Sequence, residues 1–209
     1  MKSIKRPKPP AKLLNNPWPA FLPEPKFEAW SQHFLDEDGL LSNPDHAHLQ
    51  AARIGVLWTN VEASRQMMRI VGQAEIPTPP PSGGKWSRAK FEYQITEWFG
   101  HHPLDFLITL YAPYAIECDD LSFCSLFEHE LYHCGQRVDE FGEPKFRKDG
   151  TPVFGIRGHD VEEHVGIVRR YGARAGAGLT VELINAAKSE PEVGAAQIAV
   201  ACGTCRLAG

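Results

Sequence analysis

The sequence predicts an α+β fold built on a small twisted sheet with a helix packed beneath it. Two apolar, bounded segments, 53–59 and 101–114, are rich in residues that favour strands. Two longer segments, 86–99 and 119–138, place their apolar residues near a period of 3.6, which is typical of amphipathic helices. Helices and strands are therefore interspersed along the chain.

The composition is that of an ordinary globular domain: 209 residues, of which 43% are hydrophobic and 23% charged. A net charge of −4 gives no basic field, so we do not expect nucleic acid as a partner. No run of about 18 apolar residues occurs and prolines interrupt the basic N-terminus, so we expect neither a membrane span nor a signal peptide. A cytoplasmic protein is the expectation, with its five cysteines as thiols or metal ligands.

The first 26 residues contain seven prolines, which predicts an extended arm. We expect Trp18 and Phe21 to dock this arm on the domain. The domain itself is expected to cover residues 27–175, and residues 176–209 to form a C-terminal extension.

Local signals place the remaining elements. Asn43 can cap a helix that has Pro44 at its first position. Lys148-Asp149-Gly150 suits a hairpin turn, and Gly172 can end a helix. The expected elements are helices at 27–35, 43–52, 158–172 and 180–188, a hairpin at 140–156, a loop at 77–85, and a segment at 65–76 that fits either a strand or a helix.

The helix predicted for 119–138 contains the motif His129-Glu130-Leu131-Tyr132-His133. Positions i and i+4 of a helix lie on one face, so the imidazoles of His129 and His133 can bind one Zn²⁺. Glu130 would then hold a zinc-bound water, remove its proton as the catalytic base, and pass that proton to the leaving amine. The alternative is an ordinary amphipathic helix in which the two histidines form a polar stripe.

A catalytic zinc usually has three protein ligands, so one more is expected outside the motif. Residues 158–166 read GHDVEEHVG, and His159 and Glu163 would share a face of a helix there. We favour His159 as the third ligand and keep Glu163 as the alternative. Asp160 could orient a histidine ligand through its ring N–H.

Four segments together resemble the putative phage metallopeptidase family: DFLITLYAPY, FEHELYHCGQ, KDGTPVFGIRGHDVEEHVGIVRRYG and CGTC. The likeness covers the chain from about residue 27 onward and is most specific over 104–172, although His164 stands where an aromatic residue is expected. Members are encoded by tailed bacteriophages and prophages. The resemblance implies a compact zincin-like metallopeptidase domain in the bacterial host cytoplasm, a bound Zn²⁺, and a peptide or protein substrate. It implies a site at His129, Glu130 and His133.

Two further questions stay open at the level of the sequence. Cys202-Gly-Thr-Cys205 has the spacing of a zinc or redox pair, and Cys118 and Cys124 are its candidate partners if the C-terminus folds back. The chain could also be a non-catalytic, metal-binding phage accessory protein that binds a host or virion protein, or a zinc hydrolase that cleaves a cell-wall peptide cross-link. An open fourth position on the metal would favour an enzyme, and a blocked one the binding protein.

Overall fold

The computed structural model describes residues 5–65, 68–161, 165–173, 178–196 and 202–204. The chain divides into two compact units, Met1–Arg157 with Ala196–Gly209, and Gly158–Ala195. The first unit contains α1 (Ala11–Leu14), β1 (Phe21–Pro23), α2 (Lys26–Leu35), the 3-10 helix η1 (Pro44–Ala51), β2 (Ile54–Thr59), β3 (Ala63–Arg65), β4 (Met68–Ile70), β5 (Gly72–Glu75), α3 (Lys85–Phe99), β6 (Phe106–Tyr111), α4 (Ala112–Glu117), α5 (Asp120–His133), β7 (Cys134–Gln136) and β8 (Phe154–Ile156). The second unit contains α6 (Val165–Tyr171) and α7 (Leu179–Ala186). The fold is therefore α+β, as the sequence predicts.

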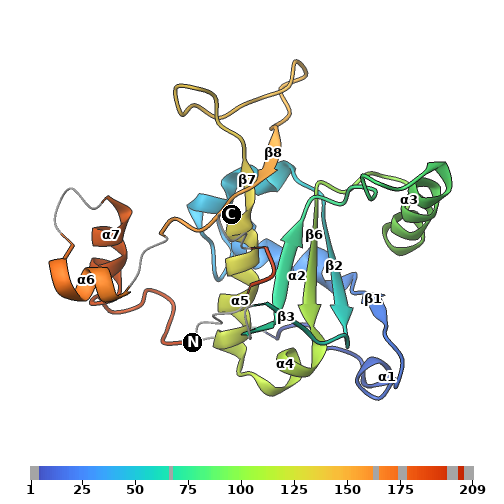
Figure 1. The fold of residues 1–209 in the computed structure, drawn as a ribbon, viewed down its shortest axis with the longest axis horizontal. Helices are drawn as coiled ribbons and strands as arrows, with labels where there is room; N and C mark the ends of the chain where they lie inside the picture. Colours follow the sequence, from blue (N-terminus) through green and yellow to red (C-terminus); the bar gives the residue numbers. More distant parts are fainter. Residues whose placement is uncertain (1–4, 66–67, 162–164, 174–177, 197–201, 205–209) are drawn as a thin grey trace. The chain divides into compact units, whose positions relative to one another are not determined.

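A four-stranded sheet in the order β1-β2-β6-β5 forms the centre of the first unit (Figure 1). The two strands predicted from composition, β2 and β6, are its parallel middle pair, with Val56 opposite Ile108. The ambiguous segment 65–76 supplies β5, which pairs antiparallel with β6 and lies at one edge of the sheet. This edge is where the metal-site motif lies, because α5 packs against β5.

An aromatic cluster fixes α5 to α2 and to the sheet. Phe127 of α5 stacks on Phe27 with ring centroids 5.1 Å apart, and it meets the rings of Trp30 and Phe34 at 5.0 and 5.6 Å. Trp58 of β2 closes the cluster at 5.3 Å from Phe27. These side chains are buried. Since Phe127 lies only two residues before His129, the cluster also sets the position of the motif.

Local capping explains where α5 begins. Asp119 is its N-cap: one carboxylate oxygen accepts the backbone N–H of Ser122 at 2.9 Å and the other accepts the Ser122 hydroxyl at 2.7 Å. These hydrogen bonds lower the pKa of the Asp119 carboxyl. At the other end the helix stops at His133, because Cys134 begins β7. The motif therefore forms the last turn of α5, which ends five residues before the end of the predicted segment 119–138.

The N-terminal arm is bound to the domain differently from the prediction. Trp18 is 75% exposed, so its expected docking is wrong, and Phe21 belongs to the edge strand β1. The buried contacts come instead from Leu13, which is 1% exposed, and from Arg6, which is 5% exposed. The Arg6 guanidinium donates to Asp120 at 2.7 Å and to two backbone carbonyls of the α4–α5 region. It therefore docks at the end of α5 opposite the motif.

The hairpin is longer than the sequence predicts. Its paired strands are β7 and β8, which begin at Cys134 and end at Ile156, while isolated bridges join the intervening segments. Gly150 in the Lys148-Asp149-Gly150 turn has φ of 82°, which only glycine adopts without strain. The longer pairing brings Arg157, directly after β8, back to the last turn of α5.

The helix observed in the second unit is shorter than the one expected at 158–172. Residues 158–161 are not helical, and α6 begins at Val165 after three residues outside the described part of the chain. Gly172 ends α6 with φ of 74°, as predicted. The helix face that His159 and Glu163 were expected to share is therefore not present at His159, and Glu163 lies outside the described residues.

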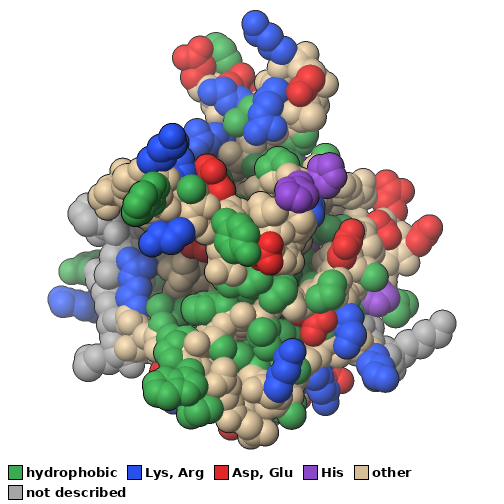
Figure 2. Space-filling view, turned by 90° about the vertical axis from the view of Figure 1, so that its right-hand side faces the viewer, with side chains coloured by type: hydrophobic (Ala, Val, Ile, Leu, Met, Phe, Trp, Pro, Cys, Tyr) green, Lys and Arg blue, Asp and Glu red, His purple; other side chains and the backbone are tan. Residues whose placement is uncertain are grey.

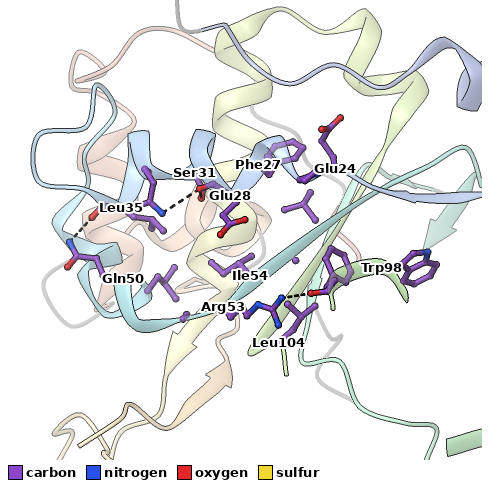
Figure 3. Close-up of a pocket in the computed structure, with 17 residues that line it drawn as sticks. Glu24, Phe27, Glu28, Ser31, Leu35, Gln50, Arg53, Ile54, Trp98 and Leu104 are labelled. Atoms are coloured by element: carbon purple, nitrogen blue, oxygen red, sulfur yellow. Dashed lines mark hydrogen bonds between the residues drawn. The ribbon is translucent and has the colours of Figure 1, made fainter. Parts of the chain in front are cut away.

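A cavity of about 330 Å³ lies between α2, the start of β2 and the end of α3, and Figure 3 shows its lining. Arg53 spans it and donates hydrogen bonds to the carbonyls of Phe99 and His102. No residue of the motif lines this cavity. On the face that includes α3 and β1, hydrophobic side chains gather between scattered charged ones (Figure 2). Within the described residues, no helix combines the length and the apolar character needed to cross a bilayer.

Phe127→Ala should lower the free energy of unfolding by about 3–5 kcal/mol, because it leaves a cavity in the aromatic cluster. Chemical denaturation measures the change. Phe141→Ala is the matched control, since Phe141 is 81% exposed in the hairpin and its loss should change stability by less than about 0.5 kcal/mol. Equal destabilisation by the two variants would contradict the assigned core.

Candidate metal centre

The last turn of α5 brings the two histidines of the motif together. Nε2 of His129 lies 3.2 Å from Nε2 of His133, and the ring centroids are 4.9 Å apart. His133 is buried and His129 is half-buried. Two imidazole nitrogens at this separation repel each other through their lone pairs unless a proton or a cation lies between them. The pair is therefore arranged as a cation site or as a shared-proton pair.

Backbone pairing of the hairpin fixes the orientation of His133. Its Nδ1 lies 2.7 Å from the carbonyl oxygen of Arg157, the residue that follows β8. A carbonyl only accepts, so Nδ1 carries the proton and donates it. Nε2 is then the nitrogen with the available lone pair. A backbone carbonyl bound to the remote ring nitrogen is a typical support of a metal-binding histidine.

Glu130 lies beneath β5 and is completely buried. Oε2 lies 3.3 Å from the Thr204 hydroxyl, whereas Oε1 has no hydrogen-bond partner among the described residues. Burial raises the pKa of Glu130 well above that of an ordinary carboxyl, and the neighbouring Cys202 raises it further. A buried carboxyl with one unpartnered oxygen is the kind of group that functional sites retain.

The close passage of β5 over Glu130 depends on glycine. A Cβ atom at Gly72 would lie 2.5 Å from Oε1 of Glu130 and 2.9 Å from the side chain of Leu126. Both contacts are shorter than van der Waals separation. The missing side chain of Gly72 therefore makes the space that the Glu130 carboxyl occupies.

Cys202 completes the cluster from the other end of the chain. Its Sγ lies 3.2 Å from Nε2 of His133 and 3.7 Å from Oε2 of Glu130. Burial opposes the charged form of the thiol, but hydrogen bonds with His129 and His133 outweigh this effect and lower the pKa of Cys202 below its ordinary value. The cluster thus combines two imidazoles, a carboxyl and an acidic thiol.

This donor set fits a divalent ion of the zinc type. Ligand atoms of His129, Glu130 and Cys202 all lie within 4.8 Å of one another. Typical Zn–N bonds of about 2.0–2.1 Å with tetrahedral angles separate two nitrogens by about 3.3 Å. The nitrogens of His129 and His133 are 3.2 Å apart. Imidazole and thiolate are also the ligands that zinc prefers over carbonyl or water oxygens.

A layer of polar side chains supports the motif from η1. The Asn43 amide donates to Glu128 at 2.8 Å and to the hydroxyl of Tyr132 at 2.9 Å, and that hydroxyl donates to Asp45 at 2.9 Å. His48 Nε2 lies 2.8 Å from the carbonyl of Cys134, just beyond the motif. The predicted cap at Asn43 is confirmed, because its side chain accepts the N–H of Asp45 at 3.0 Å. The sequence gives no sign that this segment contacts the motif helix.

The remaining candidate residues are the other cysteines and His159. Cys134 is fully buried and its thiol donates to the Glu130 carbonyl, so it is a core residue. Cys118, Cys124 and Cys202 are free cysteines, and no metal-binding group among the described residues combines Cys118 or Cys124 with Cys202; Cys205 lies outside the described residues. His159 is exposed and belongs to the second unit, and its role as third ligand stays a prediction.

A groove of about 600 Å³ lies beside the motif at the base of the hairpin. Tyr132, Arg137 and Arg157 line it together with Asp45 and the backbone of β7 and β8. The Arg157 guanidinium lies 6.0 Å from the centre of the Tyr132 ring. Tyr132 belongs to the helix turn that carries the two histidines, so the groove adjoins that turn.

Comparison with protein families gives one match. A family model described as putative phage metallopeptidase matches residues 27–188, which is most of the chain. The matched segment includes the motif and most of the second unit. Searches of curated proteins and of solved structures found no match.

Gly72→Ala should lower the free energy of unfolding by about 1–3 kcal/mol, because the added methyl group meets Glu130 and Leu126 at sub-contact distances. Thermal unfolding of the metal-free protein checks this. Gly166→Ala in α6 is the control, since a Cβ there meets nothing within 4 Å. Unchanged stability in Gly72→Ala would show that β5 does not pass over Glu130 as described.

Proposed function

Because the chain belongs to the putative phage metallopeptidase family, we propose that it is a zinc-dependent peptidase with a zincin-like site, acting in the cytoplasm of the bacterial host. The observation that carries the proposal is the pair of Nε2 atoms 3.2 Å apart with the buried Glu130 carboxyl beside them. This arrangement joins a site for a cation to a group that can accept a proton. Peptide hydrolysis needs both.

His129 and His133 are the two zinc ligands of the motif helix in this proposal. His159 is the third, since only Gly158 separates it from Arg157, whose carbonyl binds His133. Two residues of chain span at most about 7 Å, so connectivity alone keeps His159 within reach of the site. Glu163, outside the described residues, remains the alternative third ligand.

A bound zinc ion would polarise the substrate carbonyl and lower the pKa of a water molecule. Glu130 does the proton chemistry: Oε1, which no described residue engages, accepts the proton from the attacking water. Burial raises the pKa of the Glu130 carboxyl, whereas a cation held by the two histidines would favour its ionised form, so that Glu130 could accept this proton and then deliver it to the leaving amine. The aromatic core and β5 around it exclude bulk water from the transfer.

The sheet edge supports a peptide as the substrate. β5 pairs with β6 on one side only, and Gly72 and Ala74 direct backbone groups away from the sheet. An extended peptide can bind such an edge through main-chain hydrogen bonds. It would then pass directly over Glu130, which lies beneath Gly72.

One observation favours the second candidate function, a non-catalytic metal-binding phage protein that binds a host or virion protein. The thiol of Cys202 lies against His133 and Glu130, which blocks the side of the cluster that a water molecule would need. A permanently blocked site would serve structure or binding rather than hydrolysis.

Glu130→Gln should lower the rate of peptide hydrolysis by about 10²–10⁴-fold, because the amide cannot accept the proton of water. A proteome-derived peptide library and mass spectrometry measure cleavage, and zinc content should stay equal to that of the wild type. Glu128→Gln is the control on the same helix, since its amide oxygen can still accept from Asn43. Equal cleavage by Glu130→Gln and wild type would disprove the role of Glu130.

His159→Ala should weaken zinc binding by more than about 100-fold, since loss of a supporting group alone costs about 10- to 100-fold. Competition with a chromophoric chelator measures the affinity, and Glu163→Gln should keep it. His101→Ala serves as the control, because His101 is an exposed loop histidine. Loss of affinity in Glu163→Gln with retention in His159→Ala would transfer the ligand role to Glu163.

A further inference from the structure

We propose that Cys202 is a ligand of the same metal ion and that the C-terminal segment Cys202–Thr204 keeps the peptidase in a self-inhibited state. The proposal rests on the metal site of the proposed function. In this state the thiolate takes the position next to Glu130 that the attacking water requires. The segment also takes the backbone groups of β5 that an extended substrate would use.

The segment is built to fit the edge of β5. Cys202 forms a parallel bridge with Gly72, and the N–H of Gly203 donates to the Gly72 carbonyl at 2.8 Å. The Thr204 hydroxyl accepts the N–H of Ala74 at 2.7 Å and donates to the Ala74 carbonyl at 2.9 Å. Three outward backbone groups of this short strand are thus engaged by two consecutive residues, Gly203 and Thr204.

Glycine at position 203 is part of this fit. A Cβ atom there would lie 2.5 Å from the Gln73 amide oxygen and 3.0 Å from a methyl group of Ile70. The amide oxygen can move aside, but Cβ of Gln73 and the methyl group of Ile70, both 3.0 Å away, would have to shift by a few tenths of an ångström, so glycine fits here with the least displacement. Cysteine, glycine and threonine in this order supply the thiol, the close contact and the bridging hydroxyl.

Docking in this register aims the thiol at the metal site. Sγ of Cys202 lies 3.2 Å from Nε2 of His133 and 3.7 Å from the Glu130 carboxylate. A water molecule that Glu130 activates must lie between the same carboxylate and the ligand nitrogens. The sulfur and that water therefore exclude each other.

The same docking blocks peptide binding. A substrate strand on this edge needs the Gly72 carbonyl and both polar groups of Ala74, and all three are already paired with the segment. The inhibited and substrate-bound states are therefore mutually exclusive at the edge as well as at the metal.

Cobalt(II) substitution tests the thiolate bond independently of catalysis. Metal-free wild type, Cys202→Ala and Cys118→Ala are each titrated with Co²⁺, and the thiolate-to-cobalt charge-transfer absorption is recorded. Wild type and Cys118→Ala should bind one equivalent and show the band. Cys202→Ala should bind one equivalent without it. Cys118 is the matched control because it is a free, partly exposed cysteine away from the cluster.

Hydrolysis of the peptide library by the zinc forms tests the inhibition. Cys202→Ala should cleave about tenfold faster than wild type or more, since removal of the thiol opens a position that is otherwise filled most of the time. Thr204→Val keeps the thiol but loses both hydrogen bonds to Ala74, so it should weaken the band and raise cleavage to an intermediate rate.

The outcomes separate the two proposals. Wild-type protein that binds Co²⁺ without the band, or a band that persists in Cys202→Ala, overturns the assignment of Cys202 as a ligand and leaves the peptidase proposal standing. Loss of the band in Cys202→Ala without faster cleavage overturns the inhibition. Wild-type protein that binds no metal refutes the proposed function itself.

Discussion

The structure depends on one geometric constraint, the 3.2 Å separation of two imidazole nitrogens on the last turn of α5. Such a separation is costly unless a proton or a cation lies between the rings, and the surrounding fold holds the rings in place. Phe127 anchors the helix two residues before the motif, and the Arg157 carbonyl fixes the ring of His133 immediately after the hairpin. The helix ends at His133 because the next residue begins β7. The hairpin is therefore part of the site: it terminates the helix and orients a ligand at the same point.

Charge balance explains why an acid and a thiol share this space. Burial raises the pKa of Glu130, and hydrogen bonds with the histidines lower the pKa of Cys202. In the absence of metal, the negative charge is therefore favoured on sulfur and the proton on the carboxyl. A divalent ion between the histidines would favour the ionised thiol further, since an opposite charge within a few ångströms stabilises a thiolate. The arrangement has the electrostatic character of a metal centre even where only protein atoms are considered.

Much of this could be predicted from local patterns. The period of apolar residues gave α2, α3 and α5, the alternation in 106–111 gave β6, and Asn43 and Gly172 marked a helix start and a helix end. The position of Cys202 could not be predicted in this way, because it contacts Glu130 across 72 residues and no local pattern specifies such a contact. Its only sequence signal was the spacing to Cys205, which suggested a thiol pair rather than a partner of the motif. The support from η1 was missed for the same reason, since Asn43 and His48 contact Glu128 and Cys134 across 85 and 86 residues. The helix expected at 158–172 failed at its start, where residues 158–161 lack helical structure.

The enzymatic and non-catalytic hypotheses differ in a single quantity, the free energy that holds Cys202–Thr204 on β5. Three backbone-directed hydrogen bonds contribute about 0.5–1.5 kcal/mol each, which is a modest total for a three-residue segment. A substrate strand that binds the same edge forms equivalent hydrogen bonds with β5. The hydrogen bonds lost when Cys202–Thr204 leaves are therefore replaced by those of the substrate. In the proposed inhibited state, a substrate strand would not replace the thiolate–metal bond, because only a water molecule could take the position of the sulfur, so this bond would set the threshold for opening. A peptidase with this architecture is held inactive chiefly by one sulfur atom, whereas a binding protein would need further contacts that a substrate cannot replace.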